Sequence, residues 1–409
     1  MNILYLTIAR RSSQKMTKDL IDEFTNNGHK VFVVCPYDTE DFPVEHFTMI
    51  DGAHYLFVKS GYPTGKVGMI KKVKNFLSID GAFKKALSKA LKTVTIDMVL
   101  YSTPPITLVN TIEWVKKRYN AASYLMLKDI FPQNAVDLGM MKTKGVMSIP
   151  YHWFRRKEQR LYRISDYIGC MSEANVRYVL KHNPEVSAER VGICVNSYRL
   201  QAPQEINVQE VRAQFGLPQD KVIFLYGGNL GKPQGLGFLV EVLRSNMNKD
   251  DRCFVICGGG NDQRTVTDFI EKEHPENVKF ISMLSPDEFD KLSRACDVGM
   301  IFLDKRFTIP NFPSRLLSIM LNEKPVMAAT DVNTDIGEVI QKGRFGWWCE
   351  SGSLNAFNFY INDVCNHPEL IVETGKNARH YYEENYTQKN TYAQVIEGYK
   401  LISKKTTKS

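Results

Sequence analysis

The stretch that decides the fold comprises residues 222–235 and reads VIFLYGGNLGKPQG. Its first five residues form an uninterrupted apolar run, which is typical of a strand that a parallel sheet buries on both faces. A glycine-rich segment follows, and an apolar helical pattern begins at Leu236. The order strand, glycine-rich loop, helix predicts a Rossmann-like unit whose ligand binds beyond the carboxyl end of the strand.

The same alternation of short apolar runs and amphipathic stretches continues along the chain and restarts near Val222, after a polar stretch at residues 199–209. At 409 residues the chain is also too long for one compact core. Because strand–helix alternation indicates parallel sheets with right-handed crossovers, we predict an α/β fold of two Rossmann-like domains whose sheets face a central cleft. We expect an N-terminal domain at residues 1–198, a C-terminal domain at 199–385, and a helix at 386–409 that packs back toward the first domain.

The hydrophobic period places the individual elements. The expected strands are residues 3–8, 30–35, 55–58, 98–102, 123–127, 167–171, 191–195, 222–226, 253–257, 278–282, 298–302, 325–329 and 345–349. The expected helices are residues 14–27, 70–91, 107–119, 173–181, 236–243, 262–273, 286–295 and 314–321.

The composition is that of a soluble globular enzyme, with 43% hydrophobic and 24% charged residues. No apolar run approaches the ~18 residues that a membrane span needs, and the start of the chain reads as a buried strand, not as a signal peptide. The eight cysteines are dispersed through apolar runs without the spacing of metal ligands. We therefore expect buried free thiols in a reducing cytosol and no zinc site.

Charge is distributed unevenly along the chain. Residues 1–200 hold 29 Lys and Arg against 18 Asp and Glu, a net charge of +11, whereas the remainder holds 24 against 27, a net charge of −3. A basic first half indicates contact with an anionic surface or substrate. No nucleic-acid recognition motif accompanies the charge, so we expect no nucleic-acid partner.

Two glycine-rich segments follow strands of the second half. In the first segment the glycines let the backbone approach a ligand, the amides at the start of the next helix favour an anion, and Lys232 adds a positive charge. The spacing is neither G-x-G-x-x-G nor a Walker loop, which argues against dinucleotide and P-loop chemistry. The second segment, residues 258–262, reads GGGND and is weak evidence by itself. A glycine-rich turn with only a structural duty is the alternative.

Arg315 stands where the local rules of helix stability disfavour it. Residues 309–318 read IPNFPSRLLS, in which Pro313 fixes the start of a helix and Ser314 is a suitable N-cap. A basic residue in the first turn opposes the helix dipole and costs roughly a few tenths of a kcal/mol unless an anion binds nearby. We interpret this breach of the local rules as a sign of function; the alternative is a surface salt bridge.

Four stretches, taken in order, resemble glycosyltransferase family 4. They are residues 128–139, 226–235, 295–300 and 313–326, with a weaker match at 375–386, so the likeness covers nearly the whole chain. The sequence is most similar to bacterial O-antigen and capsule enzymes that transfer N-acetylated deoxyamino sugars such as N-acetylfucosamine. The resemblance implies the GT-B fold, a retaining transfer, donor binding mainly by the second domain, and no metal or cofactor besides the UDP-sugar substrate.

The resemblance also implies which residues form the site. Lys232 and Arg315 would neutralise the leaving diphosphate, where each electrostatic donor is worth roughly 3–4 kcal/mol. Backbone amides of Gly228, Asn229 and Ser314 would assist them. The further substrate-binding residues that we expect are Ser12, Ser13, Gly231, Gly259, Gly260, Asn311, Phe312, Leu316 and Ser318.

The sequence departs from the family pattern at several positions. Many members carry two glutamates eight positions apart, the second of which binds the ribose; here those positions hold Pro310 and Ser318. Asn229 and Gln234 replace the commoner Arg and Lys of the glycine loop, and a Ser-Ser pair at residues 12–13 replaces Gly-Gly after the first strand. These departures leave ribose recognition open.

Asp129 is the acidic candidate of the catalytic site. It follows a strand of the first half, where family members often place a catalytic or sugar-binding side chain. The alternative, an Asp that caps the turn before Pro132, is equally well supported. Glu350 and Glu173 are lesser candidates, and no histidine has a supporting motif.

Residues 66–92 combine many lysines with an apolar helical face, a pattern that suits an anionic membrane interface. Lys71, Lys72 and Lys74 would carry the contact. Any helix that covers a Rossmann sheet has a similar pattern, which is the alternative. Since the similar enzymes use polyprenyl-diphosphate-linked acceptors, the resemblance implies a lipid-linked saccharide acceptor and a peripheral location on the inner face of the cell membrane.

Two other functions share this architecture. A nucleotide-sugar 2-epimerase would need carboxylate and histidine groups in the cleft, which the sequence does not reveal. A non-catalytic partner subunit would explain the missing glutamates. Stabilisation by UDP would favour either enzyme over the subunit.

Overall fold

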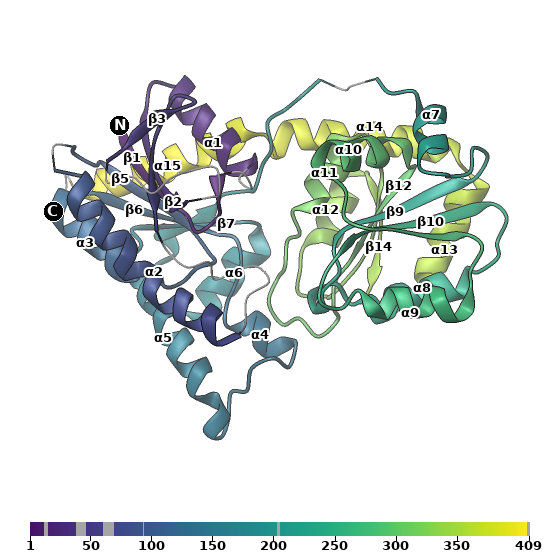
Figure 1. Ribbon diagram of the computed structural model, residues 1–409, viewed down its shortest axis with the longest axis horizontal. Helices are drawn as coiled ribbons and strands as arrows, with labels where there is room; N and C mark the ends of the chain where they lie inside the picture. Colours follow the sequence, from purple (N-terminus) through teal and green to yellow (C-terminus); the bar gives the residue numbers. More distant parts are fainter. Residues whose placement is uncertain (12–14, 38–45, 60–68, 93, 203–204, 407–409) are drawn as a thin grey trace. The chain divides into compact units, whose positions relative to one another are not determined.

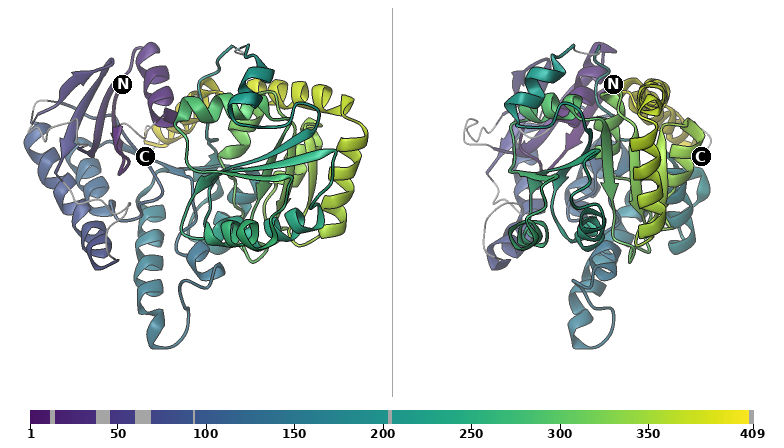
Figure 2. Two further views of the ribbon diagram at one scale, coloured as in Figure 1. Left: turned by 45° about the vertical axis from the view of Figure 1, so that its right-hand side comes forward. Right: turned by 90° about the vertical axis from the view of Figure 1, so that its right-hand side faces the viewer.

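The computed structural model describes residues 1–409 except 12–14, 38–45, 60–68, 93, 203–204 and 407–409, and the side chains of residues 69–77 and 404–406 also lie outside the described part. The chain forms two compact units. Unit 1 comprises Met1–Arg199 together with Thr387–Ser409, and unit 2 comprises Leu200–Tyr386. Each unit has its own sheet with helices on both faces (Figures 1 and 2). The predicted α/β class is confirmed.

Unit 1 is built on an eight-stranded sheet with the order β3-β4-β2-β1-β5-β6-β7-β8. Its strands are β1 (Asn2–Leu6), β2 (Lys30–Pro36), β3 (Thr48–Ile50), β4 (Ala53–Val58), β5 (Met98–Ser102), β6 (Ala122–Leu127), β7 (Tyr167–Cys170) and β8 (Val191–Ile193). All neighbours are parallel except β3 and β4, which run antiparallel. Strand β3 was not predicted, because a strand of three residues shows no readable hydrophobic period.

The helices of unit 1 cover both faces of this sheet. They are α1 (Lys15–Asn26), α2 (Met69–Ala90), α3 (Val109–Tyr119), α4 (Gln133–Asp137), α5 (Ile149–Ile164), α6 (Glu173–His182) and α15 (Gln388–Thr406). On one face α1 and α15 pack together over the side chains of Ile3 and Tyr5. On the other face α3 contacts both α2 and α5.

Helix α15 belongs to unit 1 although it follows unit 2 in the chain. Its Tyr392 ring meets the ring of Phe24 from α1 edge-on, with centroids 5.2 Å apart. Gly398 lies so close to β6 and β7 that an added Cβ would come within 2.6 Å of Tyr124 and 2.8 Å of Tyr167. The last helix therefore seals the aromatic core of the first unit.

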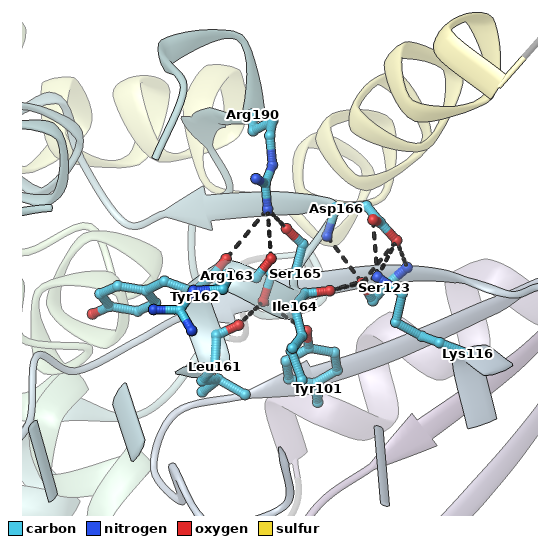
Figure 3. A network of polar contacts seen from close by, with 10 residues as sticks. All are labelled: Tyr101, Lys116, Ser123, Leu161, Tyr162, Arg163, Ile164, Ser165, Asp166 and Arg190. Carbon is cyan, nitrogen blue, oxygen red and sulfur yellow. Dashed lines mark hydrogen bonds and ion pairs between the residues drawn. The ribbon is translucent and has the colours of Figure 1, made fainter. Parts of the chain in front are cut away.

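The carboxyl-terminal end of α5 is fixed to the sheet of unit 1 by a network of polar contacts (Figure 3). Arg190 donates to backbone carbonyls there, including that of Tyr162, and a cation is favourable at this end of a helix dipole. Asp166, just beyond the helix, accepts from the amide of Ser123 at 2.9 Å and pairs with Lys116 at 2.8 Å. The opposite end of α5 extends away from the sheet (Figures 1 and 2).

Unit 2 contains a six-stranded parallel sheet with the order β11-β10-β9-β12-β13-β14. Its strands are β9 (Val222–Asn229), β10 (Arg252–Gly259), β11 (Val278–Ile281), β12 (Val298–Phe302), β13 (Val326–Thr330) and β14 (Gly346–Glu350). Its helices are α7 (Val208–Gln214), α8 (Leu236–Ser245), α9 (Arg264–Glu273), α10 (Pro286–Ala295), α11 (Arg315–Leu321), α12 (Ile336–Gly343), α13 (Leu354–Asn366) and α14 (Glu369–Asn385).

The central strand β9 is buried on both faces, which explains its uninterrupted apolar run. Phe224 and Tyr226 belong to the core under α8 and α13, while Ile223 and Leu225 belong to the core under α10. Successive side chains of a strand point to opposite faces, so each face receives alternate residues.

Strands β9 and β10 continue beyond the apolar runs that predicted them. The ladder extends through the pairs Gly227↔Cys257, Gly228↔Gly258 and Asn229↔Gly259. The expected strand ends were therefore too early, because glycines can pair in a ladder without adding to the hydrophobic pattern. The chain starts this sheet at β9 and adds β10 on one side and β12 on the other. The strand order therefore reverses at β9. At such a switch point, beyond the carboxyl ends of the strands, parallel sheets bind ligands.

The eight cysteines are all free thiols, and seven of them are buried. In the part of the chain that the structure describes, no helix has both the length and the apolar character needed to cross a bilayer. Nor do the described His, Cys, Asp and Glu residues form a group of three or more that could hold a metal ion.

Candidate functional site

Three loops meet at the switch point of unit 2, and backbone hydrogen bonds join them. The amide of Leu230, after β9, donates to the carbonyl of Gly259 at 3.0 Å, and the amide of Asp262 returns a bond to Leu230 at 2.9 Å. The loop after β12 joins them where the amide of Asp304 donates to the carbonyl of Pro233 at 3.0 Å. The glycine segments that the sequence presents separately thus form one structure at the carboxyl edge of the sheet.

Most glycines in these loops are required by chain packing. A Cβ at Gly258, whose φ is +145°, would lie 1.9 Å from the carbonyl oxygen of Gly228, and a Cβ at Gly260 would lie 2.2 Å from that of Leu230. A Cβ added at Gly235, whose φ is +56°, would press on the backbone at Asp304. These glycines have a structural duty, and so does Gly228, whose φ is +124°. Only the side chains around them therefore indicate a ligand.

Arg315 is the side chain that makes this edge a candidate binding site. Its Cζ lies 4.7 Å from the ring centroid of Tyr226 and 3.6 Å from the position that a Cβ would take at Gly228. Its Nη1 is buried and makes no hydrogen bond, and no described carboxylate forms a salt bridge with it, so the surface-salt-bridge alternative finds no partner there. A buried charged donor without a partner is unfavourable. A bound anion would satisfy it.

A small cavity of about 20 Å³ opens beside this guanidinium, with Ser318 and Lys324 among its lining residues. This volume suffices for a single water molecule. Burial lowers the pKa of Lys324, although nearby Asp297 acts in the opposite direction. Tyr226 and Lys324 are not among the site residues that the sequence predicts. Tyr226 lies in an apolar run that is typical of a core strand, whereas Lys324 lies within residues 313–326, one of the stretches that carry the family resemblance.

Lys232 is exposed and begins the 3₁₀ turn Lys232–Gln234. The two residues that depart from the family pattern here bond to each other, since Gln234 Oε1 accepts from Asn229 Nδ2 at 3.3 Å. The same oxygen accepts from the amide of Gly231 at 3.1 Å. The hydroxyl of Tyr226 donates to the carbonyl of Asn229 at 2.9 Å, so the turn that presents Lys232 is held from within.

The segment before α11 is partly core and partly surface. Phe312 and Leu316 are buried, and the amide of Leu316 already donates to the carbonyl of Pro313, so they support the segment from inside. Asn311 is half-buried, and its carbonyl accepts from the hydroxyl of Thr334 at 2.7 Å. The segment is thus tied to the loop after β13.

Ser314 and Ser318 are both half-buried beside Arg315. The expectation that Ser314 caps the helix was wrong, because its backbone is already helical and its side chain makes no capping hydrogen bond. The hydroxyl of Ser318 donates to the carbonyl of Arg315 at 2.9 Å. Pro310, at the position of the first family glutamate, is buried.

Asp129 belongs to unit 1, where it follows β6 as expected. Nδ2 of Asn134 donates to both carboxylate oxygens, at 3.0 and 2.9 Å, and the Thr103 hydroxyl donates to the Asp129 carbonyl. Burial raises the pKa of Asp129 to about 6, against the lowering effect of the hydrogen bonds. These contacts suit the turn-forming alternative, and the raised pKa suits a group that holds a proton near neutral pH. Ser12 and Ser13 lie outside the described residues.

The lysine-rich stretch of α2 is described only in its second half, because the side chains of Lys71, Lys72 and Lys74 lie outside the described part. Further along this helix, Phe83 and Leu87 are completely buried in unit 1. The apolar face of residues 78–92 therefore packs on the sheet, which supports the alternative of an ordinary surface helix for that part.

Comparisons with known proteins point to one activity. Residues 207–381 match the family model described as Glycosyl transferases group 1. The chain is 23% identical over 302 residues to the probable glycosyltransferase WbjE of Pseudomonas aeruginosa, and the match covers 71% of each protein.

The structure is similar to that of sucrose-phosphate synthase from Thermosynechococcus elongatus, with a TM-score of 0.76 and 14% identity over 98% of each chain. It is also similar to Anabaena HepE in complex with UDP-glucose, with a TM-score of 0.68 and 14% identity over 97% of this chain and 98% of that one. These likenesses show the GT-B fold, and the family match supports glycosyltransferase activity in the unit that holds Arg315.

Proposed function

We propose that this chain is a retaining, metal-independent glycosyltransferase that moves a sugar from a UDP-sugar to a lipid-linked saccharide. The observation that carries the proposal is the buried, unpartnered Nη1 of Arg315 at the switch point of unit 2. A diphosphate is the anion that suits this position, because it offers several oxygens to a planar guanidinium.

Transfer requires the bond between the anomeric carbon of the sugar and the diphosphate oxygen to break. Negative charge then grows on the diphosphate, and Arg315 and Lys232 would stabilise it more in the transition state than in the bound donor. The acceptor hydroxyl forms the new bond to the anomeric carbon and loses its proton. Asp129 is our candidate for the base that accepts this proton, because burial raises its pKa to about 6 and so makes its carboxylate more basic.

The donor is proposed to be a UDP-sugar with an N-acetylated amino or deoxyamino group, as the sequence resemblance implies. HepE, which shares the fold, binds UDP-glucose. Ser318 would offer a ribose hydroxyl one neutral hydrogen bond where the family offers a carboxylate. Such a bond contributes about 1 kcal/mol, so we expect weaker nucleotide binding than in glutamate-bearing relatives.

The product is proposed to enter capsule, O-antigen or exopolysaccharide synthesis, with the enzyme bound peripherally at the inner face of the cell membrane. This part rests on the resemblance to O-antigen and capsule enzymes and on the basic first half of the chain.

Thermal unfolding of the full chain with UDP, ADP and GDP tests the donor site. UDP at a hundred times its dissociation constant should stabilise the protein by about 2.7 kcal/mol, and this gain should vanish in Arg315→Ala. Analysis of the reaction products then separates a transferase from a nucleotide-sugar 2-epimerase. No stabilisation by any nucleotide would favour a non-catalytic partner subunit, which the absence of both family glutamates at Pro310 and Ser318 keeps open.

A further inference from the structure

Large exposed apolar side chains of unit 1 gather in one place. Met140, Val146, Met147, Ile149 and Trp153 are 57%, 83%, 68%, 66% and 36% exposed, respectively. They lie in the loop between α4 and α5 and at the start of α5, a segment that we name the α5 tip (residues 140–153). Within the described residues of unit 1, the other exposed large apolar side chains are two isolated ones, Met49 and Leu401.

The α5 tip is embedded in basic sequence. Residues 138–157 contain five Lys and Arg and no Asp or Glu. Lys142, Lys144 and Arg156 are exposed. Arg155, in contrast, donates to Glu158 and to Asn183 and is therefore engaged inside unit 1. The tip thus combines an apolar end with unopposed positive charge beside it.

The exposure of these side chains belongs to an ordered structure. Ser148 bonds through both its amide and its hydroxyl to the carbonyl of Gly145, at 3.0 and 2.7 Å, and so closes the turn before α5. Pro150 lies in the first turn of the helix, where its missing N–H is not needed. The far end of α5 is anchored to the sheet by the contacts around Arg190 and Asp166 (Figure 3). A rigid helix therefore holds the tip away from the sheet of unit 1 (Figures 1 and 2).

Trp153 has the environment of an interfacial tryptophan. Its ring packs edge-on against Phe154, with centroids 4.8 Å apart, and Phe154 is held in turn by Phe131. Nζ of Lys157 lies 5.5 Å from the Trp153 ring. Tryptophan beside lysine is favoured at the boundary between headgroups and acyl chains.

We propose that the α5 tip inserts into an anionic lipid bilayer, with its apolar side chains among the upper acyl chains and Lys142, Lys144 and Arg156 at the lipid headgroups. The inference deepens the proposed function and rests on it in one respect, since a lipid-linked acceptor is what would bring this enzyme to a membrane. It places the contact at a different surface from the lysines of α2.

Two observations favour a bilayer over a protein partner. A stable protein interface uses about 20–30 residues a side, whereas the tip offers five large apolar side chains. The charge at the tip also has one sign, which suits a surface of anionic lipids and gives no pairing for a second copy of the same segment.

Flotation with vesicles tests the surface on the full-length protein. The wild type should float with vesicles that contain phosphatidylglycerol and much less with phosphatidylcholine alone, and added salt should weaken the binding. The triple variant Val146→Ser, Met147→Ser, Ile149→Ser should lower the partition coefficient by roughly 100-fold. The matched control is Phe359→Ser with Val372→Ser, which removes side chains of similar exposure, 66% and 62%, from unit 2 and should float like the wild type.

A second pair of variants separates the two basic surfaces. Lys142→Ser, Lys144→Ser and Arg156→Ser together should lower binding roughly 100-fold at low salt, because each basic group near the surface contributes about tenfold or less. Removing exposed lysines of the α2 region by Lys84→Ser with Lys85→Ser should have a much smaller effect. Loss of binding only in the α2 variant would overturn the proposal, as would equal flotation of wild type and both tip variants.

Brominated lipids give a direct readout of insertion. They should quench part of the tryptophan fluorescence of the wild type, and Trp153→Phe should remove that part while the protein still floats. Quenching that persists in Trp153→Phe would contradict insertion at the tip. The α5 tip would be a protein interface instead if the wild type self-associated without binding vesicles and only the tip variants lost this self-association.

UDP binding measured on the same variants keeps this inference apart from the proposed function. Tip variants that bind UDP normally but do not float would support the inference. A wild type that binds UDP but ignores anionic vesicles would refute the α5 tip and leave the donor site standing. A wild type that floats but binds no nucleotide would refute the proposed function alone.

Discussion

The guanidinium of Arg315 lies over the ring of Tyr226, with Cζ 4.7 Å from the ring centroid. The two residues come from different segments of unit 2: Tyr226 lies within β9, and Arg315 begins the helix that follows the β12 loop. A ring face attracts a cation, and the buried Nη1 of Arg315 makes no hydrogen bond within the described residues. The hydroxyl of Tyr226 is fixed to the carbonyl of Asn229, so the same tyrosine braces both the arginine and the glycine-rich turn.

Replacing Arg315 tests the electrostatic part of the proposed mechanism. Arg315→Ala should lower kcat by ~100-fold or more, because it removes a charge from the leaving diphosphate. Arg315→Lys should also be impaired, since an ammonium cannot reproduce the planar fork of a guanidinium. Steady-state kinetics with a UDP-sugar donor measure both. Arg244→Ala, which breaks an exposed ion pair with Glu273, is the control and should transfer sugar like the wild type. Normal kinetics in Arg315→Ala would remove this residue from the site.

Lys232 should act on the same charge from the glycine-rich turn. We expect Lys232→Ala to lower turnover by ~100-fold while leaving the melting temperature unchanged, because the side chain is exposed. Lys249→Ala removes another exposed lysine elsewhere in unit 2 and serves as the control. A loss confined to KM, with kcat intact, would mean that Lys232 binds the donor without stabilising the transition state.

Asp129 should make the stability of unit 1 depend on pH. Its folded-state pKa is raised to about 6 from a usual value of 3.8, so the folded protein holds the proton more firmly than the unfolded chain. The wild type should therefore lose stability as pH rises from about 4 to 6, by at most about 3 kcal/mol. Asp129→Asn cannot titrate, and its melting temperature relative to wild type should rise across this interval. Parallel melting curves for the two proteins would exclude the raised pKa.

Gly258 should tolerate no side chain. A Cβ there would lie 1.9 Å from the carbonyl oxygen of Gly228, and its φ of +145° is strained for any other residue. We expect Gly258→Ala to destabilise unit 2 by about 2–3 kcal/mol or more. Gly237, in α8, has no atom within 4 Å of an added Cβ. Gly237→Ala should therefore be neutral or slightly stabilising, and similar melting temperatures for the two variants would contradict the close approach of β9 and β10.

The sequence predicted the strands best where burial on both faces leaves an uninterrupted apolar run. The expected strands at 98–102 and 298–302 coincide with β5 and β12. Helix α5, in contrast, was not expected. Its sequence is rich in charged and aromatic residues and its first turn is exposed, so it lacks the continuous apolar stripe that a fully packed helix shows.

The sequence predicted only those residues of the candidate site that a local pattern marks. Arg315 could be singled out because it breaks a local rule of helix stability, and Lys232 because it follows glycines. Tyr226 obeys the rules for a buried strand residue, so nothing local marks it. Its contact with Arg315 joins β9 to the helix after the neighbouring strand β12, which is a property of the tertiary structure.

Helix α15 gives the two units an order of completion during synthesis. The ribosome finishes all of unit 2 before it releases the residues of α15, although that helix belongs to unit 1. Until then the rings of Tyr124 and Tyr167, against which Gly398 packs, lack their cover. Unit 1, which is the first to be synthesised, is thus the last to complete its core. A nascent chain stopped before Thr387 would carry an exposed aromatic surface on unit 1.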